Sequence, residues 1–186
     1  MRKLLVFLLF AAFAGANDAR AYNPFMGDYE NQVAVYLGQG VNNGFIIPPP
    51  FQLVPFYMLQ FQYSQPTTFF RIPARQSINF GETIGVGKKY GWDWRAYTIP
   101  MIFLSEDIAL LYGRNWYLSV GAGGGLQAQQ NERIGSKWLF QAKLALAYRF
   151  TECAGAEIYI QHFSNGNTAE ENNSYGFYGV GFVYNF

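Results

Sequence analysis

Residues 138–150 read WLFQAKLALAYRF, and this stretch decides the fold class. Its apolar side chains occupy alternate positions and therefore share one face of an extended strand: Trp138, Phe140, Ala142, Leu144, Leu146, Tyr148 and Phe150. The opposite face carries Gln141, Lys143 and Arg149. This alternation is typical of a transmembrane β-strand whose apolar face meets lipid and whose polar face meets a barrel interior.

The last stretch, residues 174–186, repeats the pattern. Its outward face carries Tyr178, Val180, Phe182, Tyr184 and Phe186, while Gly179 and Gly181 face inward. Inward glycines fit a narrow, packed lumen. The terminal aromatic residue also resembles the C-terminal signal by which outer-membrane barrels are recognised for assembly.

Six further strands are predicted at about residues 32–40, 51–64, 77–90, 96–112, 116–129 and 153–164. With the stretches at 138–150 and 174–186 the total is eight, an even number as expected for an outer-membrane barrel. We therefore predict an all-β, eight-stranded antiparallel transmembrane barrel. Eight strands enclose a space that side chains fill. We therefore expect Lys143, Arg149, Glu157 and Gln161 to form a polar core and not a pore.

The beginning of the chain predicts export. A basic start, an apolar run at 4–14 and a small-x-small pattern at 19–21 are typical of a signal peptide, and the run is too short to span a bilayer as a helix. We expect a signal peptide at 1–21 and a single barrel domain at 22–186 in the bacterial outer membrane.

The composition agrees with a lipid environment. Aromatic residues make up 19% of the chain, charged residues 13%, and the formal net charge is +1. This balance gives no indication of nucleic-acid binding, and it leaves the oligomeric state open. We interpret Glu106 and Asp107 as loop or turn charges.

One predicted strand breaks the apolar pattern on its outward face. There Ala156, Ile158 and Ile160 are followed by His162 and Ser164. Residues two apart in a strand point the same way, so the imidazole could accept the proton of the serine hydroxyl. The alternative is that these polar side chains simply face lipid headgroups at the membrane surface.

Barrel topology predicts where the pair lies. If Phe186 ends at the periplasmic face, the strand at 153–164 runs outward and His162 and Ser164 lie near the outer surface. The outer leaflet there consists of lipopolysaccharide. A serine nucleophile at that depth would meet ester-linked acyl chains.

The segment Gln161-His162-Phe163-Ser164-Asn165-Gly166, followed by Asn172-Asn173 and a closing aromatic strand, resembles the lipid A 3-O-deacylase (PagL) family. The resemblance implies an eight-stranded barrel that hydrolyses the 3-O-linked acyl ester of lipid A in lipopolysaccharide, with no cofactor or metal. It also implies that His162 is the general base, Ser164 the nucleophile and Asn165 a contributor to the oxyanion hole.

The sequence departs from that family at the acid of the triad. Where the family has a glutamate on the last strand, this chain has Gly176. Glu170 or Glu171 in the preceding loop is a possible replacement, and a dyad without an acid is another possibility. The departure also favours the alternative of a non-enzymatic small barrel that serves adhesion or membrane integrity.

Overall fold

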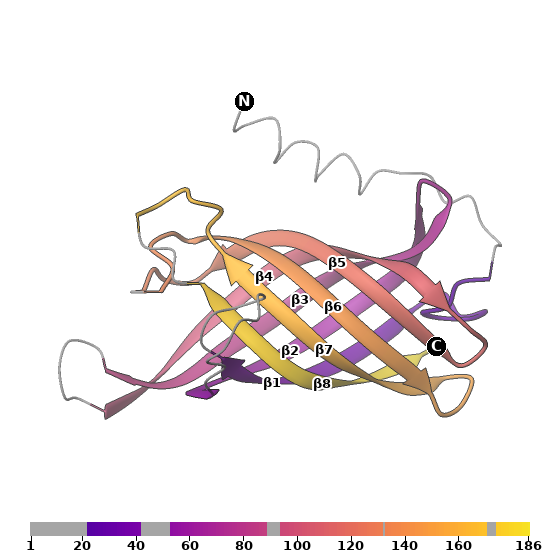
Figure 1. Ribbon diagram of the computed structural model, residues 1–186, viewed down its shortest axis with the longest axis horizontal. Helices are drawn as coiled ribbons and strands as arrows, with labels where there is room; N and C mark the ends of the chain where they lie inside the picture. The colour runs from indigo at the N-terminus through magenta and orange to yellow at the C-terminus, as the bar shows by residue number, and fades with distance from the viewer. Residues whose placement is uncertain (1–21, 42–52, 89–93, 132, 171–173) are drawn as a thin grey trace.

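The computed structural model describes residues 22–41, 53–88, 94–131, 133–170 and 174–186, so the predicted signal peptide lies outside the described residues. The eight strands are β1 (Gln32–Val41), β2 (Leu53–Phe69), β3 (Ile72–Lys88), β4 (Trp94–Tyr112), β5 (Trp116–Gln127), β6 (Trp138–Arg149), β7 (Ala154–Ser164) and β8 (Tyr175–Asn185). Each strand pairs antiparallel with its sequence neighbour, and β8 pairs with β1 to close the barrel (Figure 1). The predicted fold is confirmed.

The hairpin of β2 and β3 is longer than the sequence pattern predicted. β2 continues to Phe69, β3 begins at Ile72, and Phe70 and Arg71 form the turn between them with φ values of 49° and 70°. Positive φ at both turn residues gives the twist that a two-residue hairpin needs. Pro66 lies within β2 and Pro73 lies within β3.

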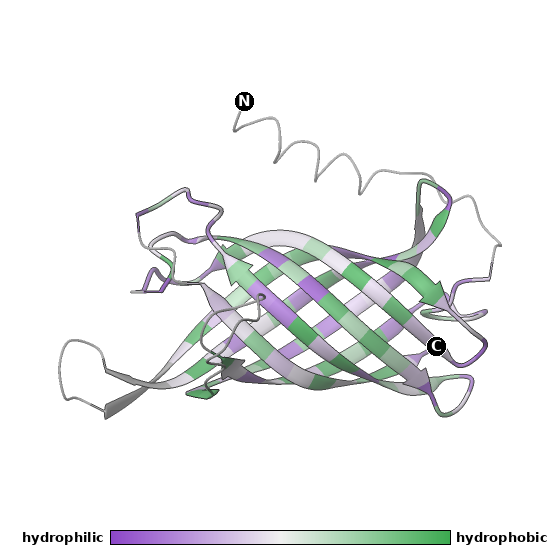
Figure 2. Ribbon diagram, in the orientation of Figure 1, coloured by the Kyte–Doolittle hydropathy of each residue, from purple (hydrophilic) through white to green (hydrophobic). Residues whose placement is uncertain are grey.

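Alternation along the strands separates the two faces of the barrel. Trp138 on β6 is 56% exposed, whereas its neighbour Leu139 is 1% exposed. Figure 2 shows hydrophobic and hydrophilic residues in alternation along the strands. The outward face therefore presents apolar side chains to lipid, as predicted. Within the described part of the chain, no helix is long and apolar enough to cross a membrane.

The two ends of the barrel differ in the length of their connections. One end has the short turns at residues 70–71, 113–115 and 150–153, whereas the connections at the other end include residues 128–137 and 165–174. Short turns are typical of the periplasmic end of an outer-membrane barrel. By this rule β7 runs from the periplasmic end to the outer end.

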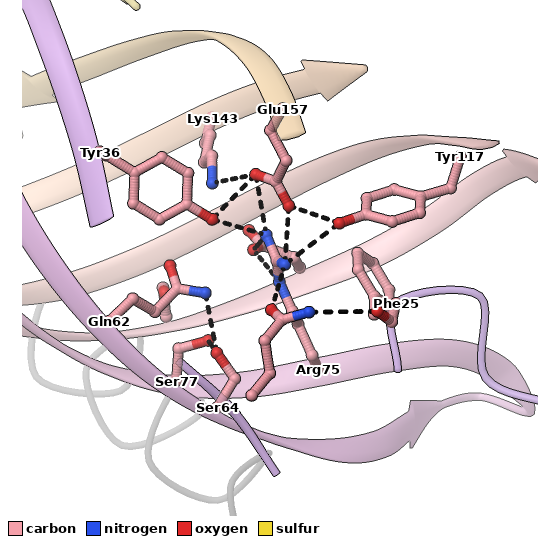
Figure 3. Close-up of polar contacts among 12 residues, drawn as sticks. Phe25, Tyr36, Gln62, Ser64, Arg75, Ser77, Tyr117, Lys143 and Glu157 are labelled. Carbon is pink, nitrogen blue, oxygen red and sulfur yellow. Dashed lines mark hydrogen bonds and ion pairs between the residues drawn. The ribbon is translucent and has the colours of Figure 1, made fainter. Parts of the chain in front are cut away.

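The periplasmic half of the lumen contains a buried ion network (Figure 3). Glu157 pairs with Arg75 at 2.8 Å and with Lys143 at 3.0 Å, and it accepts hydrogen bonds from the hydroxyls of Tyr36 and Tyr117. Arg75 also donates from Nε to Oδ2 of Asp107 at 2.8 Å. Two cations and two carboxylates thus compensate each other away from water.

The outer half of the lumen contains a cluster of buried aromatic side chains. Buried rings of Phe56, Phe103, Phe163, Tyr175 and Phe177 contact one another, with centroid separations from 4.9 to 6.4 Å. Gly179 and Gly181 make room for lumenal rings, because a Cβ on Gly181 would lie 2.3 Å from the ring of Tyr36. Side chains therefore fill the lumen, in agreement with the expected packed interior.

Two interpretations of charged residues were wrong. Glu106 and Asp107 are not loop or turn residues, since both lie within β4. Asp107 faces the lumen, where Arg75 supplies a buried partner. Arg149 does not join the core, since it lies at the periplasmic end of β6, where its guanidinium donates to the carbonyl of Arg114 and contacts the ring of Tyr22. Lys143, Glu157 and Gln161 are buried, as predicted.

The segment before β1 closes the periplasmic end of the lumen, which the sequence analysis did not anticipate. Phe25 and Met26 are fully buried, and the ring of Phe25 lies 4.7 Å from the guanidinium carbon of Arg75. The Phe25 carbonyl accepts a hydrogen bond from Gln32 Nε2 at 3.1 Å. The segment thus covers the ion network on its periplasmic side.

We predict that Glu157→Gln lowers the free energy of unfolding by about 3–5 kcal/mol, because removing one partner leaves a buried charge uncompensated. The measurement is urea unfolding in detergent micelles, followed by tryptophan fluorescence. The control is Glu152→Gln in the exposed turn at 150–153, which should leave stability unchanged. Equal midpoints for both variants would contradict the role of the ion network.

Candidate active site on the barrel wall

β7 holds the two residues that the sequence singled out. His162 and Ser164 lie at its outer end, and both are half-buried on the face that also carries Ile158 and Ile160. Phe163, between them, is fully buried in the cluster of rings in the lumen, so the side chains before and after it point outward. The regular alternation of β7 therefore brings the imidazole and the hydroxyl to the same side of the wall.

β6 supplies apolar neighbours on one side of the pair. Ala142 lies opposite His162, and Phe140 lies opposite Ser164. Directly opposed residues have Cβ atoms roughly 4.5–5.5 Å apart, so both side chains adjoin the pair. The imidazole and hydroxyl thus lie beside hydrocarbon groups, where electrostatic interactions are stronger than in water.

The chain turns tightly directly after Ser164. The carbonyl of Asn165 accepts hydrogen bonds from the Thr168 backbone N–H at 3.2 Å and from the Thr168 hydroxyl at 2.7 Å. Gly166 has a φ of 60°, and a Cβ added there would lie 2.9 Å from the ring of Phe140. Both the backbone conformation and the close packing therefore favour glycine at this position. Asn165 itself is fully buried.

β8 borders the pair on the other side with a glycine. Gly176 is the cross-strand partner of His162 and is buried. It lies on the same face of β8 as Tyr178 and Val180, so its face matches that of the imidazole. The position nearest to His162 on β8 therefore carries no side chain that could orient the ring.

Two loop carboxylates were candidates for the acid of the triad, and the structure describes only one of them. Glu170 is exposed, and among the described residues it makes no hydrogen bond or ion pair. Glu171 lies outside the described residues. The structure thus brings His162 and Ser164 onto one face, with Asn165 next to them in the chain, and does not bring Glu170 into contact with them. No group of metal-ligating side chains occurs within the described ranges.

The sequence analysis missed a contact that positions the start of β8. Arg133, in the loop between β5 and β6, donates from Nη1 to the carbonyl of Ser174 at 3.3 Å. Its guanidinium carbon lies 5.4 Å from the ring centroid of Phe56. Ser174 has a φ of 57°, unusual for a residue with a side chain, and it comes two residues before Gly176. Because two separate loops meet here, no sequence period predicts the contact.

Comparison with solved structures supports the fold. The crystal structure of the outer membrane enzyme PagL matches with a TM-score of 0.52 and 13% identity, over 83% of this chain and 99% of that chain. Neisserial surface protein A matches with a TM-score of 0.60 and 11% identity, over 84% and 97% of the respective chains. At these identities the likeness concerns the fold alone. The comparison with curated proteins finds no match.

A family comparison covers the half of the chain that contains the site. The family model described as lipid A 3-O-deacylase (PagL) matches residues 85–185, which include β7, β8 and the loop between them. This range is more than half of the chain. The fold is an eight-stranded outer-membrane barrel, and the family match includes the strand that carries His162 and Ser164. The chain therefore belongs to the PagL family of lipid A deacylases.

Proposed function

We propose that this barrel hydrolyses the 3-O-linked acyl ester of lipid A, with Ser164 as nucleophile and His162 as general base. The observation that carries the proposal is the shared outward face of the two residues at the outer end of β7. Family membership supports the substrate class. The position of the ester and the serine mechanism are our inference from these residues and from the resemblance of the surrounding motif.

The chemistry follows from the two side chains. The imidazole of His162 takes the hydroxyl proton as the Ser164 oxygen attacks the ester carbonyl. When the tetrahedral intermediate collapses, the bond between the acyl carbon and the sugar oxygen breaks. The imidazolium then gives the proton to the departing sugar oxygen. Water then attacks the acyl-serine with the same base and releases a free 3-hydroxy fatty acid.

The oxyanion of the tetrahedral intermediate needs donors close to Ser164. Asn165 follows Ser164 directly, and the turn at Gly166, where the Asn165 carbonyl accepts the Thr168 N–H, supplies further backbone N–H groups within a few residues. We assign Asn165 and these backbone groups to the oxyanion hole. Each donor of this kind contributes roughly 3–4 kcal/mol to transition-state stabilisation.

Access to the ester follows from the side of the wall that the pair occupies. The outer end of β7 faces the leaflet that contains lipid A, and the outward face is the one that meets lipid. Lipid A can therefore approach from within the membrane plane, without entering the filled lumen. We place the reaction at the outer leaflet for this reason.

We predict that Ser164→Ala lowers deacylation at least roughly a thousandfold, because the substitution removes the nucleophile. Purified protein is incubated with lipopolysaccharide in detergent, and loss of a 3-hydroxyacyl group is followed by mass spectrometry of lipid A. The control is Ser119→Ala, which removes a buried hydroxyl on the inner face of β5. Equal activity in wild type and Ser164→Ala would refute the assigned role.

Gly176 offers a second test of the same chemistry. We predict that Gly176→Glu raises kcat roughly ten- to a thousandfold, since a carboxylate opposite His162 would stabilise the imidazolium that forms during the reaction. The matched control is Gly176→Gln, which has the same size without the charge. A gain in both variants, or in neither, would argue against this electrostatic effect.

A barrel without catalytic function is the second candidate, and Gly176 is the observation that favours it. Such a protein should leave lipid A unchanged when produced in a heterologous outer membrane. His162→Ala would then have no effect on lipid A composition, whereas the proposed esterase requires that this substitution abolish the loss of acyl chains.

A further inference from the structure

The lipid-facing wall formed by β8, β1 and β2 contains a hollow of about 480 Å³, within the usual size range of small-molecule sites. Its principal lining residues are outward-facing side chains of these three strands: Val33, Val35, Phe61, Tyr63, Phe182 and Tyr184. The hollow lies near the beginning of β1 and the end of β8, in the periplasmic half of the wall. It is separate from the site on β7.

The strand register explains why this part of the wall is hollow. Val33 lies directly between Tyr63 of β2 and Tyr184 of β8. In the next row toward the outer surface, Val35 lies between Phe61 and Phe182. Two short valine side chains therefore form a floor along β1, with an aromatic ring on each side of both.

The next lipid-facing position of β1 toward the outer surface carries a longer side chain than valine. Leu37 is 51% exposed and lies between Leu59 and Val180, so a longer side chain is flanked there by aliphatic residues instead of rings. The hollow thus extends over two rows from the periplasmic side and ends toward the middle of the membrane. The two rows lie roughly 7 Å apart along the strand.

The periplasmic end of the hollow is polar. The Tyr63 hydroxyl donates a hydrogen bond to Asn31 Oδ1 at 2.6 Å and accepts one from Gln65 Nε2 at 3.3 Å. These groups are exposed at the end of the barrel where the short turns lie. The hollow therefore changes from apolar to polar in the direction of the periplasmic surface.

We propose that this hollow binds a phospholipid of the periplasmic leaflet. One acyl chain lies along Val33 and Val35 between the aromatic rings, and the glycerol and headgroup region meets Tyr63, Asn31 and Gln65. The direction of the polarity gradient identifies the leaflet, because a lipid with its headgroup at the outer surface would present its polar part to the opposite end of β1. The proposal is independent of the deacylase activity.

The test is native mass spectrometry of protein released from nanodiscs that contain equal amounts of phosphatidylethanolamine, phosphatidylglycerol and lipopolysaccharide. Val35→Trp fills the floor of the hollow. The matched control is Val120→Trp on β5, an outward valine that lies between Ile108 and Leu144, in a row without aromatic walls. We expect wild type and Val120→Trp to retain one phospholipid, and Val35→Trp to retain at least tenfold less.

Three outcomes would overturn the proposal: equal phospholipid retention in Val35→Trp, retention of lipopolysaccharide at this position in place of phospholipid, or a wild-type dimer that Val35→Trp converts to a monomer. The last result would assign the hollow to a second copy of the chain. Only species with the heat-dependent gel shift of a folded barrel are compared. Val33→Phe fills the lower row and must reproduce the loss if Val35→Trp does not fold.

Discussion

Closure of the hydrogen-bond ladder between β8 and β1 is the constraint on which the rest of the molecule depends. In a bilayer an unpaired backbone group costs several kcal/mol, so the first and last strands must satisfy each other. Their paired residues run from Gln32 with Asn185 to Val41 with Gly176. Closure fixes which face of every strand meets lipid, and thereby turns a simple alternation of residues into an inside and an outside.

The narrowness of the closed barrel then determines where chemistry can occur. Buried rings occupy the outer half of the lumen, and the network of Arg75, Glu157, Lys143 and Asp107 occupies the other half. Phe25 covers that network at the periplasmic end. With the interior filled, a substrate as large as lipid A meets the protein at its wall, and the proposed reaction uses the outward face of β7 for this reason.

Much of this arrangement was predictable from the sequence, because period-two alternation is a local property. The stretch at 138–150 predicted both faces of β6, and the same pattern placed His162 and Ser164 on one outward face. The partners across the lumen were not predictable. Asp107 read as a turn charge because Arg75, its partner, is 32 residues away in sequence, and nothing local identifies Phe25 as the cover of the ion network. The opposition of Gly176 and His162 required the register of β7 and β8.

The proposed nucleophile lies on a membrane-facing wall, and covalent labelling tests this claim most directly. The folded protein is treated with a long-chain fluorophosphonate, and the modified residue is identified by peptide mass spectrometry. We expect a single adduct on Ser164, formed at least tenfold more slowly in His162→Asn. Absence of an adduct at Ser164, or labelling of it at the same rate without the histidine, would contradict the claim.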